Sequence, residues 1–289
     1  MIRALAFIAG LLIAGVTARA ADIEAVGHVV IPVSDLAHDS IFYTEALSCV
    51  PGENAGSPSV VLHLGREAIE LVQRRGRPIP TDSRSNDGWF QHLAIVVSDI
   101  YRAYAMVRRA GAMPISTAPQ ELPAWNPHAG GIRAVYFRDP DGHPLELIQY
   151  PAGKGEPRWQ EKDRLFLGID HTAIAVGDTD VSLGFYRDRL GLRIAGMSEN
   201  WGIEQQRLSA VHGAHVRITT LRSKSGPGIE LLHYLIPRDG RPMPSDTGID
   251  DLWSEEIALI SGELSIPEER LRDPDGHALR ITAGEEISR

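Results

Sequence analysis

Four residues that can bind a metal ion occur once each in four apolar, strand-like segments of the first half of the chain. They are His28 in GHVVIPV, Glu70 in IELVQ, His92 in QHLAIVV and Glu146 in LELIQ. Taken singly, a strand histidine is more often a satisfied core or edge residue, and a strand glutamate usually faces solvent. On the inner face of a strand such a group costs free energy unless it is paired or coordinated. If the four converge, two imidazoles and two carboxylates suit Zn²⁺, Ni²⁺, Co²⁺, Mn²⁺ or Fe²⁺, with positions left for water or substrate.

The elements that must position these side chains are repeated along the chain. Residues 27–49 align with residues 170–192, and in both copies alternating apolar residues predict a strand, followed by an Asp N-cap and a helical period ending in FY. Three further pairs follow in the same order. They are IELVQ with IELLH, QHLAIVVSD with EEIALISGE, and FRDPDGHPLEL with LRDPDGHALRI. Each half therefore repeats one structural plan.

The two halves predict two domains, over 22–150 and 165–289, joined by a linker at 151–164 that is rich in Pro, Gly and charge. The copies differ in length, because His92 to Asp139 is a much longer interval than Glu256 to Asp273. The first half uses this interval for a predicted helix that begins near Asp99 and ends at Gly111. The second half has no room for that helix.

In combination, these motifs resemble the vicinal oxygen chelate superfamily, also called the glyoxalase, bleomycin-resistance and extradiol-dioxygenase superfamily. The resemblance implies an α+β fold of tandem βαβββ modules forming two open barrels, the C-terminal one degenerate. Metal ligands in the family lie on the first and last strands of paired modules. This implies a glyoxalase I-like set of His28, Glu70, His92 and Glu146, with Glu70 or Glu146 also serving as the general base. The turn Asp139–Gly142 resembles the turn that precedes the family's last ligand.

The second half carries His171, Glu230, Glu256 and Arg280 at the corresponding positions. Because arginine cannot ligate a cation, the second half is expected to lack a metal centre. It is expected to serve instead as a folding partner and as a wall of the pocket. Arg280 is expected to form an ion pair with Glu230 or Glu256. The alternative is that the halves exchange modules, as some family members do, which would redistribute the ligands between the two barrels.

The resemblance implies a metal-dependent lyase or isomerase that acts on a small, oxygen-rich carbonyl compound. Two other functions stay open. A ring-cleaving dioxygenase needs two histidines and one carboxylate on Fe²⁺ or Mn²⁺, which His28, His92 and Glu146 can supply. A protein of the bleomycin-resistance type would instead sequester a ligand without the metal set.

A loop before the last strands of the first half, ELPAWNPHAGGIRAVYF, contains candidate pocket residues. Trp125, Asn126 and His128 can line a pocket and Arg133 can meet a carboxylate, although a solvated loop with one aromatic anchor is an equal expectation. Two further tryptophans, Trp89 and Trp253, hold equivalent positions in the repeats and are expected in the core. The histidine of the first DPDGH turn, His143, is expected at the surface.

Charge and the N-terminus define the expected environment. The formal net charge of −9, with no basic block, makes nucleic acid and anionic membrane surfaces poor partners, so a small-molecule substrate is expected.

Residues 1–20 combine a positive start, an apolar run and Ala18-Arg19-Ala20, which predicts a signal peptide and export to the periplasm. The single cysteine, Cys49, is expected to be a buried thiol, and the chain to be a monomer or homodimer.

Overall fold

The computed structural model describes residues 22–52, 58–263 and 266–284. The predicted signal peptide over 1–20 lies outside the described residues. Among the residues that are described, no helix is long and apolar enough to cross a membrane.

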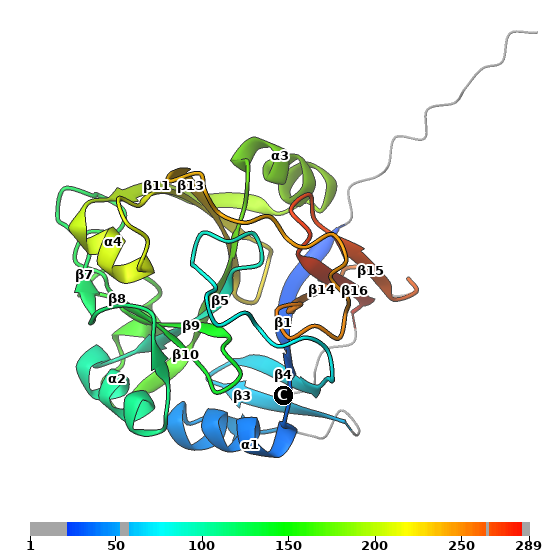
Figure 1. Cartoon of the computed structure of the whole chain (residues 1–289), viewed down its shortest axis with the longest axis horizontal. Coiled ribbons are helices and arrows are strands. Elements are labelled where there is room, and N and C mark those ends of the chain that lie inside the picture. Colours follow the sequence, from blue (N-terminus) through cyan, green and yellow to red (C-terminus); the bar gives the residue numbers. More distant parts are fainter. Residues whose placement is uncertain (1–21, 53–57, 264–265, 285–289) are drawn as a thin grey trace, which may run out of the picture.

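Two open, mixed sheets form the body of the protein (Figure 1). The first sheet has seven strands, in the order β15 (Glu269–Arg272), β16 (Ala278–Ala283), β14 (Glu256–Ser261), β1 (Ile23–Val33), β4 (Glu67–Gln73), β3 (Ser59–Leu64) and β2 (Val50–Pro51). The second has nine, in the order β11 (Arg193–Trp201), β12 (His215–Arg222), β13 (Gly228–Ile236), β10 (Phe166–Ala175), β5 (Gln91–Val97), β9 (Pro144–Gln149), β8 (Arg133–Arg138) and β6 (Met113–Pro114), with β7 (Gln120–Glu121) pairing with β8. The predicted α+β class with tandem modules is confirmed.

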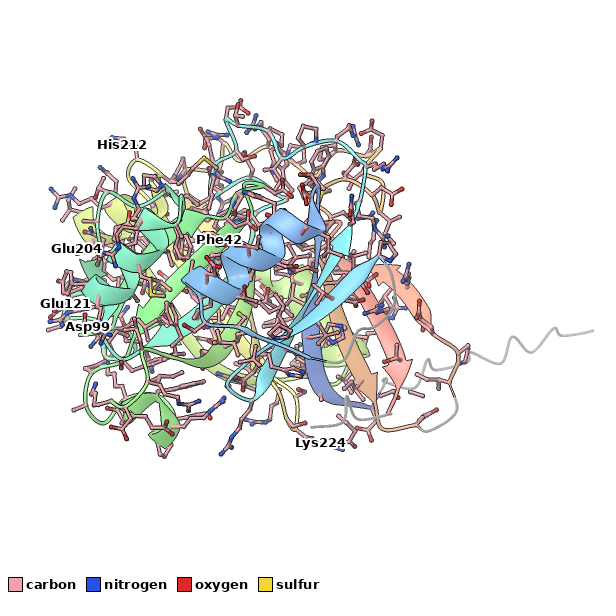
Figure 2. The ribbon with its side chains drawn as sticks, turned by 90° about the horizontal axis from the view of Figure 1, so that it is seen from below. Phe42, Asp99, Glu121, Glu204, His212 and Lys224 are labelled. Atoms are coloured by element: carbon pink, nitrogen blue, oxygen red, sulfur yellow. The ribbon has the colours of Figure 1, made fainter. Side chains whose placement is uncertain are left out.

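The strands form four consecutive modules, β1–β4, β5–β9, β10–β13 and β14–β16, and short helical segments follow the first strand of the first three. They are α1 (Leu36–Ile41) with η1 (Phe42–Ala46), α2 (Ile100–Arg109), and α3 (Thr179–Leu183) with η3 (Gly184–Arg189); α4 (Ile203–Ser209) and η2 (Pro157–Gln160) lie in connections. Aspartates cap the N-termini as predicted, with Asp35, Asp99 and Asp178 each accepting hydrogen bonds from backbone N–H groups of the first turn. Figure 2 shows the helical segment that carries Phe42 beside the cyan strands of the first sheet, and α1 contacts β3 and β4 of that sheet.

The fourth module is the short one. Between β14 and β15 the described residues contain no helix, whereas the same interval of the second module holds α2, which buries Val107 and ends before Gly111 at φ +98°. The predicted absence of this helix from the second half is confirmed for the residues that are described.

Each sheet takes strands from both halves of the sequence. Strand β1 pairs antiparallel with β14, from the far end of the chain, and β10 pairs antiparallel with β5. Modules one and four therefore share the first sheet, and modules two and three share the second (Figure 1). The expectation that each half forms its own barrel is corrected in favour of the exchanged arrangement, because the repeated strand edges accept either partner.

The halves are also joined by two matching arginine–aspartate ion pairs, each packed against a tryptophan. Arg77 donates hydrogen bonds to both carboxylate oxygens of Asp251, and its guanidinium lies over the ring of Trp253. In the matching contact, Arg241 donates to both carboxylate oxygens of Asp87 and lies over the ring of Trp89. Both tryptophans are buried, as predicted. The repeated GRP segments thus form one pseudo-symmetric contact between connectors.

Two other expectations, for Cys49 and His143, are tested by burial. Cys49 is a buried free thiol, as predicted. His143 is fully buried, contrary to the expectation of a surface residue, because its ring contacts the Pro32 carbonyl oxygen and the Glu255 carboxylate. The predicted linker is anchored by Trp159, which is buried against the second sheet.

Candidate metal centre

Four strands of the nine-stranded sheet carry a set of ligand side chains on neighbouring positions. Ala173 of β10 pairs with His92 of β5 on one side and with Glu230 of β13 on the other. Ala94, two residues beyond His92, pairs with Glu146 of β9. A strand places alternate side chains on the same face, so these registers bring His92, Glu146, Glu230 and His171 together.

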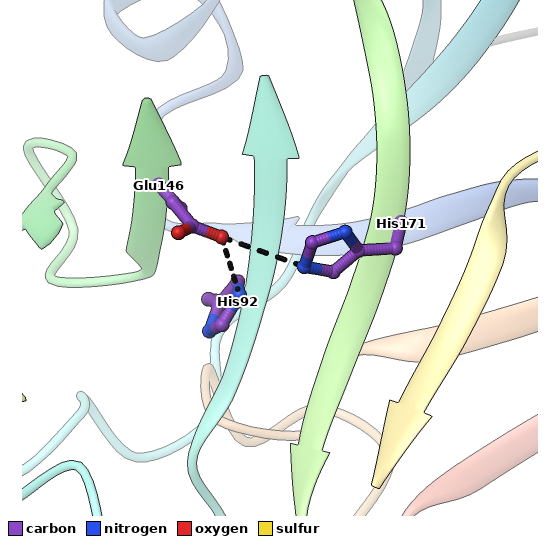
Figure 3. Close-up of side chains that lie close together, drawn as sticks. All are labelled: His92, Glu146 and His171. Atoms are coloured by element: carbon purple, nitrogen blue, oxygen red, sulfur yellow. Dashed lines mark ion pairs between the residues drawn. The ribbon is translucent and has the colours of Figure 1, made fainter. Parts of the chain in front are cut away.

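His92, Glu146 and His171 form the centre of this cluster (Figure 3). One possible ligand atom from each lies within 4.8 Å of the others. Glu146 Oε2 lies 3.1 Å from His92 Nε2 and 3.4 Å from His171 Nε2. The three residues are only 1%, 5% and 3% exposed, in the order His92, Glu146 and His171.

Glu230 provides a fourth candidate ligand. Its Oε2 atom lies 3.4 Å from His171 Nε2, and its Oε1 atom accepts a hydrogen bond from the Thr220 hydroxyl at 2.7 Å. The Glu230 side chain is 17% exposed and lines the cavity, so it is the more accessible of the two carboxylates.

The residues present fit a divalent metal ion. His92 Nδ1 is buried and has no partner among the described residues, and the Nε2 atoms of His92 and His171 face carboxylate oxygens without the geometry of a hydrogen bond. Buried polar atoms without partners are costly, and a bound cation would satisfy them. Two imidazoles and two carboxylates are also a donor set that borderline divalent ions accept.

An additional carboxylate orients His171. Asp170 Oδ2 lies 2.9 Å from His171 Nδ1, which leaves Nε2 facing Glu146 and Glu230. Asp170 is itself held by Arg222 at 2.8 Å and by the Tyr150 hydroxyl at 3.1 Å. Histidine ligands commonly donate their second N–H to a carboxylate in this way, which fixes the tautomer and the ring orientation.

Charge in the centre is balanced by contacts within it. Burial raises the pKa of the Glu146 carboxyl, but the neighbouring imidazoles of His171 and His92 outweigh burial and lower that pKa to about 2. For the Asp170 carboxyl, burial again opposes the shift, and His171 and Arg222 lower its pKa. Both carboxylates are therefore ionised at neutral pH, Glu146 as a candidate ligand and Asp170 as the group that orients His171.

Comparison with known proteins agrees with this geometry. The profile of the Glyoxalase/Bleomycin resistance protein/Dioxygenase superfamily matches residues 25–147 and 168–249. The chain belongs to this superfamily.

Two of the proteins to which the chain is similar in sequence are lactoylglutathione lyases. The chain is 28% identical over 179 residues to one from Oryza sativa subsp. japonica, and 28% identical over 174 residues to one from Arabidopsis thaliana. Each match covers 58% of this chain but only 53% and 54% of the relative, so the chain matches about half the length of each. The crystal structure of glyoxalase I from Zea mays superimposes with a TM-score of 0.60 at 17% identity, over 89% of this chain and 91% of that one, which shows a shared fold.

The ligand set that the sequence predicted for this superfamily member is divided between the two sheets. His92 and Glu146 lie in the centre described above, whereas His28 and Glu70 lie on β1 and β4 of the other sheet. The expectation that these four residues converge is corrected, because β1 pairs with β14 rather than with β5.

Arg280 occupies the middle of the corresponding cluster in the seven-stranded sheet. Its Nη2 atom lies 3.1 Å from Glu70 Oε2 and 3.2 Å from His28 Nε2, and its Nε atom lies 3.2 Å from Glu256 Oε1. A hydrogen bond from His28 and the Arg280 guanidinium lower the pKa of the Glu70 carboxyl to about 2. The predicted pairing of Arg280 with Glu256 is confirmed; Glu230 lies in the other sheet.

The cavity at the metal centre has a volume of about 240 Å³. His128 and Tyr136 line it together with Glu146, His171 and Glu230. Of the loop residues that the sequence singled out, Trp125 and Asn126 line an adjoining cleft. Arg133 instead pairs with the Glu121 carboxylate and lines none of the described cavities near the centre.

Sequence reasoning missed the role of His171 and Glu230 because it assigned ligands by half of the chain. The signal was present, since both residues occupy positions equivalent to His28 and Glu70. Asp170 had no independent signal: its contact with the adjacent ring depends on an irregularity in the pairing of β10 with β5 between Ile169 and His171.

Proposed function

We propose that this protein is a metal-dependent lyase or isomerase of the glyoxalase type, acting on a small, oxygen-rich carbonyl compound. The observation that carries the proposal is the buried cluster of His92, Glu146 and His171 with Glu230 beside it. A divalent ion in such a site polarises adjacent substrate oxygens and stabilises negative charge on them. The names of the lyase relatives support the same reaction class.

Glu230 is the carboxylate best placed to move a proton. It lines the cavity and has one oxygen held by Thr220, whereas Glu146 is buried between two imidazoles. In the proposed reaction, Glu230 accepts a proton from the carbon next to the substrate carbonyl and returns it to the neighbouring carbon. Glu146 would remain a ligand beside His92 and His171. Glu70, one of the two bases considered from sequence, is too remote to take part, because it lies on the other sheet.

The test compares Glu230→Gln with the parent protein and with Glu70→Gln, a matched change in the other sheet. The hemithioacetal of methylglyoxal and glutathione is the first substrate, followed by simple α-hydroxy carbonyl compounds, in D₂O with NMR detection of the transferred hydrogen. We expect Glu230→Gln to keep most of its metal and to lose at least a hundredfold in rate, the usual contribution of a general base being about 10²–10⁴. Glu70→Gln is expected to match the parent. Full activity of Glu230→Gln would contradict the assigned role.

A ring-cleaving dioxygenase is the second candidate function. The specific observation that favours it is the His92, Glu146 and His171 triad, because two histidines and one carboxylate are the ligand set of non-haem Fe²⁺ oxygenases. Oxygen consumption with a catechol, dependent on Fe²⁺ or Mn²⁺ and absent in Glu146→Ala, would favour this function over the lyase.

We also propose that the protein is exported to the periplasm after cleavage behind Ala20. The support is the sequence of residues 1–20 alone. N-terminal sequencing of protein expressed in a bacterial host is expected to begin at Ala21, and an intact N-terminus on protein that stays in the cytoplasm would contradict export.

A further inference from the structure

Two stacked tryptophans form an exposed platform beside the metal centre. The ring centroids of Trp125, from the loop after β7, and Trp201, at the end of β11, are 4.0 Å apart with planes inclined by 32°. The two residues are 48% and 45% exposed, and Met197 of the same cleft is 52% exposed. An exposed cluster of two indoles and a thioether is unusual on a soluble protein and marks a binding surface.

This aromatic cleft, defined by Trp125, Trp201 and Met197, adjoins the cavity at the metal centre. The cleft has a volume of about 430 Å³, and His128, Met197 and Ser198 line both it and the 240 Å³ cavity that contains Glu146, His171 and Glu230. We therefore expect a ligand whose oxygens lie at the metal centre to reach the tryptophans past these three shared residues.

The charged groups of the aromatic cleft are already paired with one another. Glu199 accepts hydrogen bonds from Arg217 at 3.0 Å and lies 2.8 Å from the Nε2 atom of His215. Arg217, the one arginine among the described residues that line the cleft, is thus engaged by Glu199, and His128 is the other basic residue there. The cleft thus favours a neutral, flat group, which gains from burial and from stacking on indole faces.

The platform is held in place by polar contacts of its own loop. Asn126 Nδ2 donates to Asn200 Oδ1 at 2.6 Å, which ties the loop to β11. Asn126 Oδ1 accepts from the backbone N–H groups of His128 and Ala129, both at 3.0 Å. A surface that is already ordered loses little conformational entropy when a ligand binds.

A second cavity adjoins the metal centre and has a different character. Its volume is about 670 Å³, and its lining includes Arg66, Arg193 and the ion pairs of Arg158 with Glu67 and of Arg222 with Asp170. A substrate with an anionic tail would use this cavity instead of the tryptophans. The two possibilities predict different ligand preferences.

We propose that the aromatic cleft is a specificity subsite, and that the natural substrate carries a flat, uncharged aromatic group attached to its oxygen-bearing carbons. This inference rests on the proposed metal centre. It adds a substrate class to the proposed function, because the metal centre by itself selects only for adjacent oxygens and not for the group that carries them.

Hydroxamates test the inference, because their two oxygens bind divalent metal ions and their acyl group can be varied. Isothermal titration of the zinc-loaded chain would use acetohydroxamate, 4-phenylbutanoyl hydroxamate and succinyl monohydroxamate, which have a small, an aromatic and an anionic tail. We expect the aromatic compound to bind at least tenfold more tightly than the other two. Stacking and apolar burial together correspond to about this factor.

Variants then locate the effect. Trp125→Ala and Trp201→Ala are each expected to lose about tenfold in affinity for the aromatic hydroxamate and to bind acetohydroxamate as the parent does. Trp125→Phe should recover most of the loss, which separates stacking from misfolding. Tyr101→Ala removes another exposed aromatic residue, which lines neither the cleft nor the two cavities described above, and should change neither affinity.

The outcomes separate the two proposals. Normal binding of acetohydroxamate with no aromatic preference, or tighter binding of the anionic compound, would overturn the aromatic subsite alone. No binding of any hydroxamate by the metal-treated chain would overturn the metal centre, and the subsite with it.

Discussion

At the scale of single residues, the candidate centre depends on which atom each side chain presents. Asp170 and His171 are neighbours in the sequence, yet their side chains meet at 2.9 Å and leave Nε2 free to face the two glutamates. His92 and Glu146 were identified from sequence because polar residues stand out in apolar strands. Asp170 was not, because an aspartate beside a histidine has no distinctive pattern.

Asp170→Asn tests the orienting contact. The amide is nearly the same size but provides no negative charge to the His171 ring, so we expect metal affinity to fall by about 10–100-fold, as for other outer carboxylates. Competition with a fluorescent chelator measures the affinity directly. Glu121→Gln, an exposed carboxylate paired with Arg133, is the control and should bind metal as the parent does. An unchanged affinity in Asp170→Asn would contradict the orienting role.

At the scale of elements, periodicity predicted the strands, the capped helices and the missing helix of the fourth module. It did not predict which strands pair across modules, because the edges of β5 and β14 have similar sequences and both accept an antiparallel partner. The ligand positions were therefore right on each strand, while their grouping was wrong. Because modules two and three share one sheet, the two modules that carry no arginine at a ligand position lie together there. In the other sheet, His28, Glu70 and Glu256 surround Arg280.

Arg280→Ala tests the cluster of the seven-stranded sheet. Removing the guanidinium leaves the buried Glu256 and the partly buried Glu70 without the cation that both contact, so we expect the free energy of unfolding at pH 7 to fall by about 1–3 kcal/mol. The pKa of Glu70 in the folded protein is lowered to about 2, so its contribution is present above the unfolded value near 4.5 and is lost as the pH falls toward 2. The difference between variant and parent should therefore shrink in acid.

Urea unfolding at pH 7 and pH 3.5 measures this difference. Arg217→Ala, which removes an exposed guanidinium paired with Glu199, is the control and should cost less than about 1 kcal/mol. A loss for Arg280→Ala that is equally large at both pH values would contradict the ionic origin of the effect.

At the scale of the whole molecule, contacts between repeated segments bind the two sheets into one structure. His143 is an example, since its turn precedes β9 while its ring contacts Pro32 of β1 and Glu255 next to β14. The equivalent His277 contacts the carbonyl oxygen of Ala175 on β10 at 2.9 Å. Sequence alone placed His143 at the surface, because a DPDG turn is normally exposed and the covering segment comes from the other half of the chain.

The His143 contacts predict a stability loss at alkaline pH. Burial by itself lowers the pKa of the His143 ring, but the Asp139 and Glu255 carboxylates outweigh it and raise that pKa to about 9. Because the folded pKa is above the unfolded value near 6.5, this stability is complete below pH 6.5 and is lost as the pH rises through 9. We expect the parent to lose up to about 3 kcal/mol over this range.

The matched variant is His143→Gln, which keeps a hydrogen-bonding group without the titration. Its free energy of unfolding should depend less on pH between 6.5 and 9 than that of the parent, as measured by urea titrations. Parallel pH profiles would contradict the assignment to His143.

The central claim is that the metal centre is built from modules two and three, and metal content after removal of single histidines tests it most directly. Plasma mass spectrometry would be applied to the parent, His171→Ala and His28→Ala after reconstitution with zinc and removal of free metal. We predict about one ion per chain in the parent and in His28→Ala, and little in His171→Ala. Loss of metal in His28→Ala with retention in His171→Ala would contradict the exchanged centre and restore the grouping by halves of the sequence.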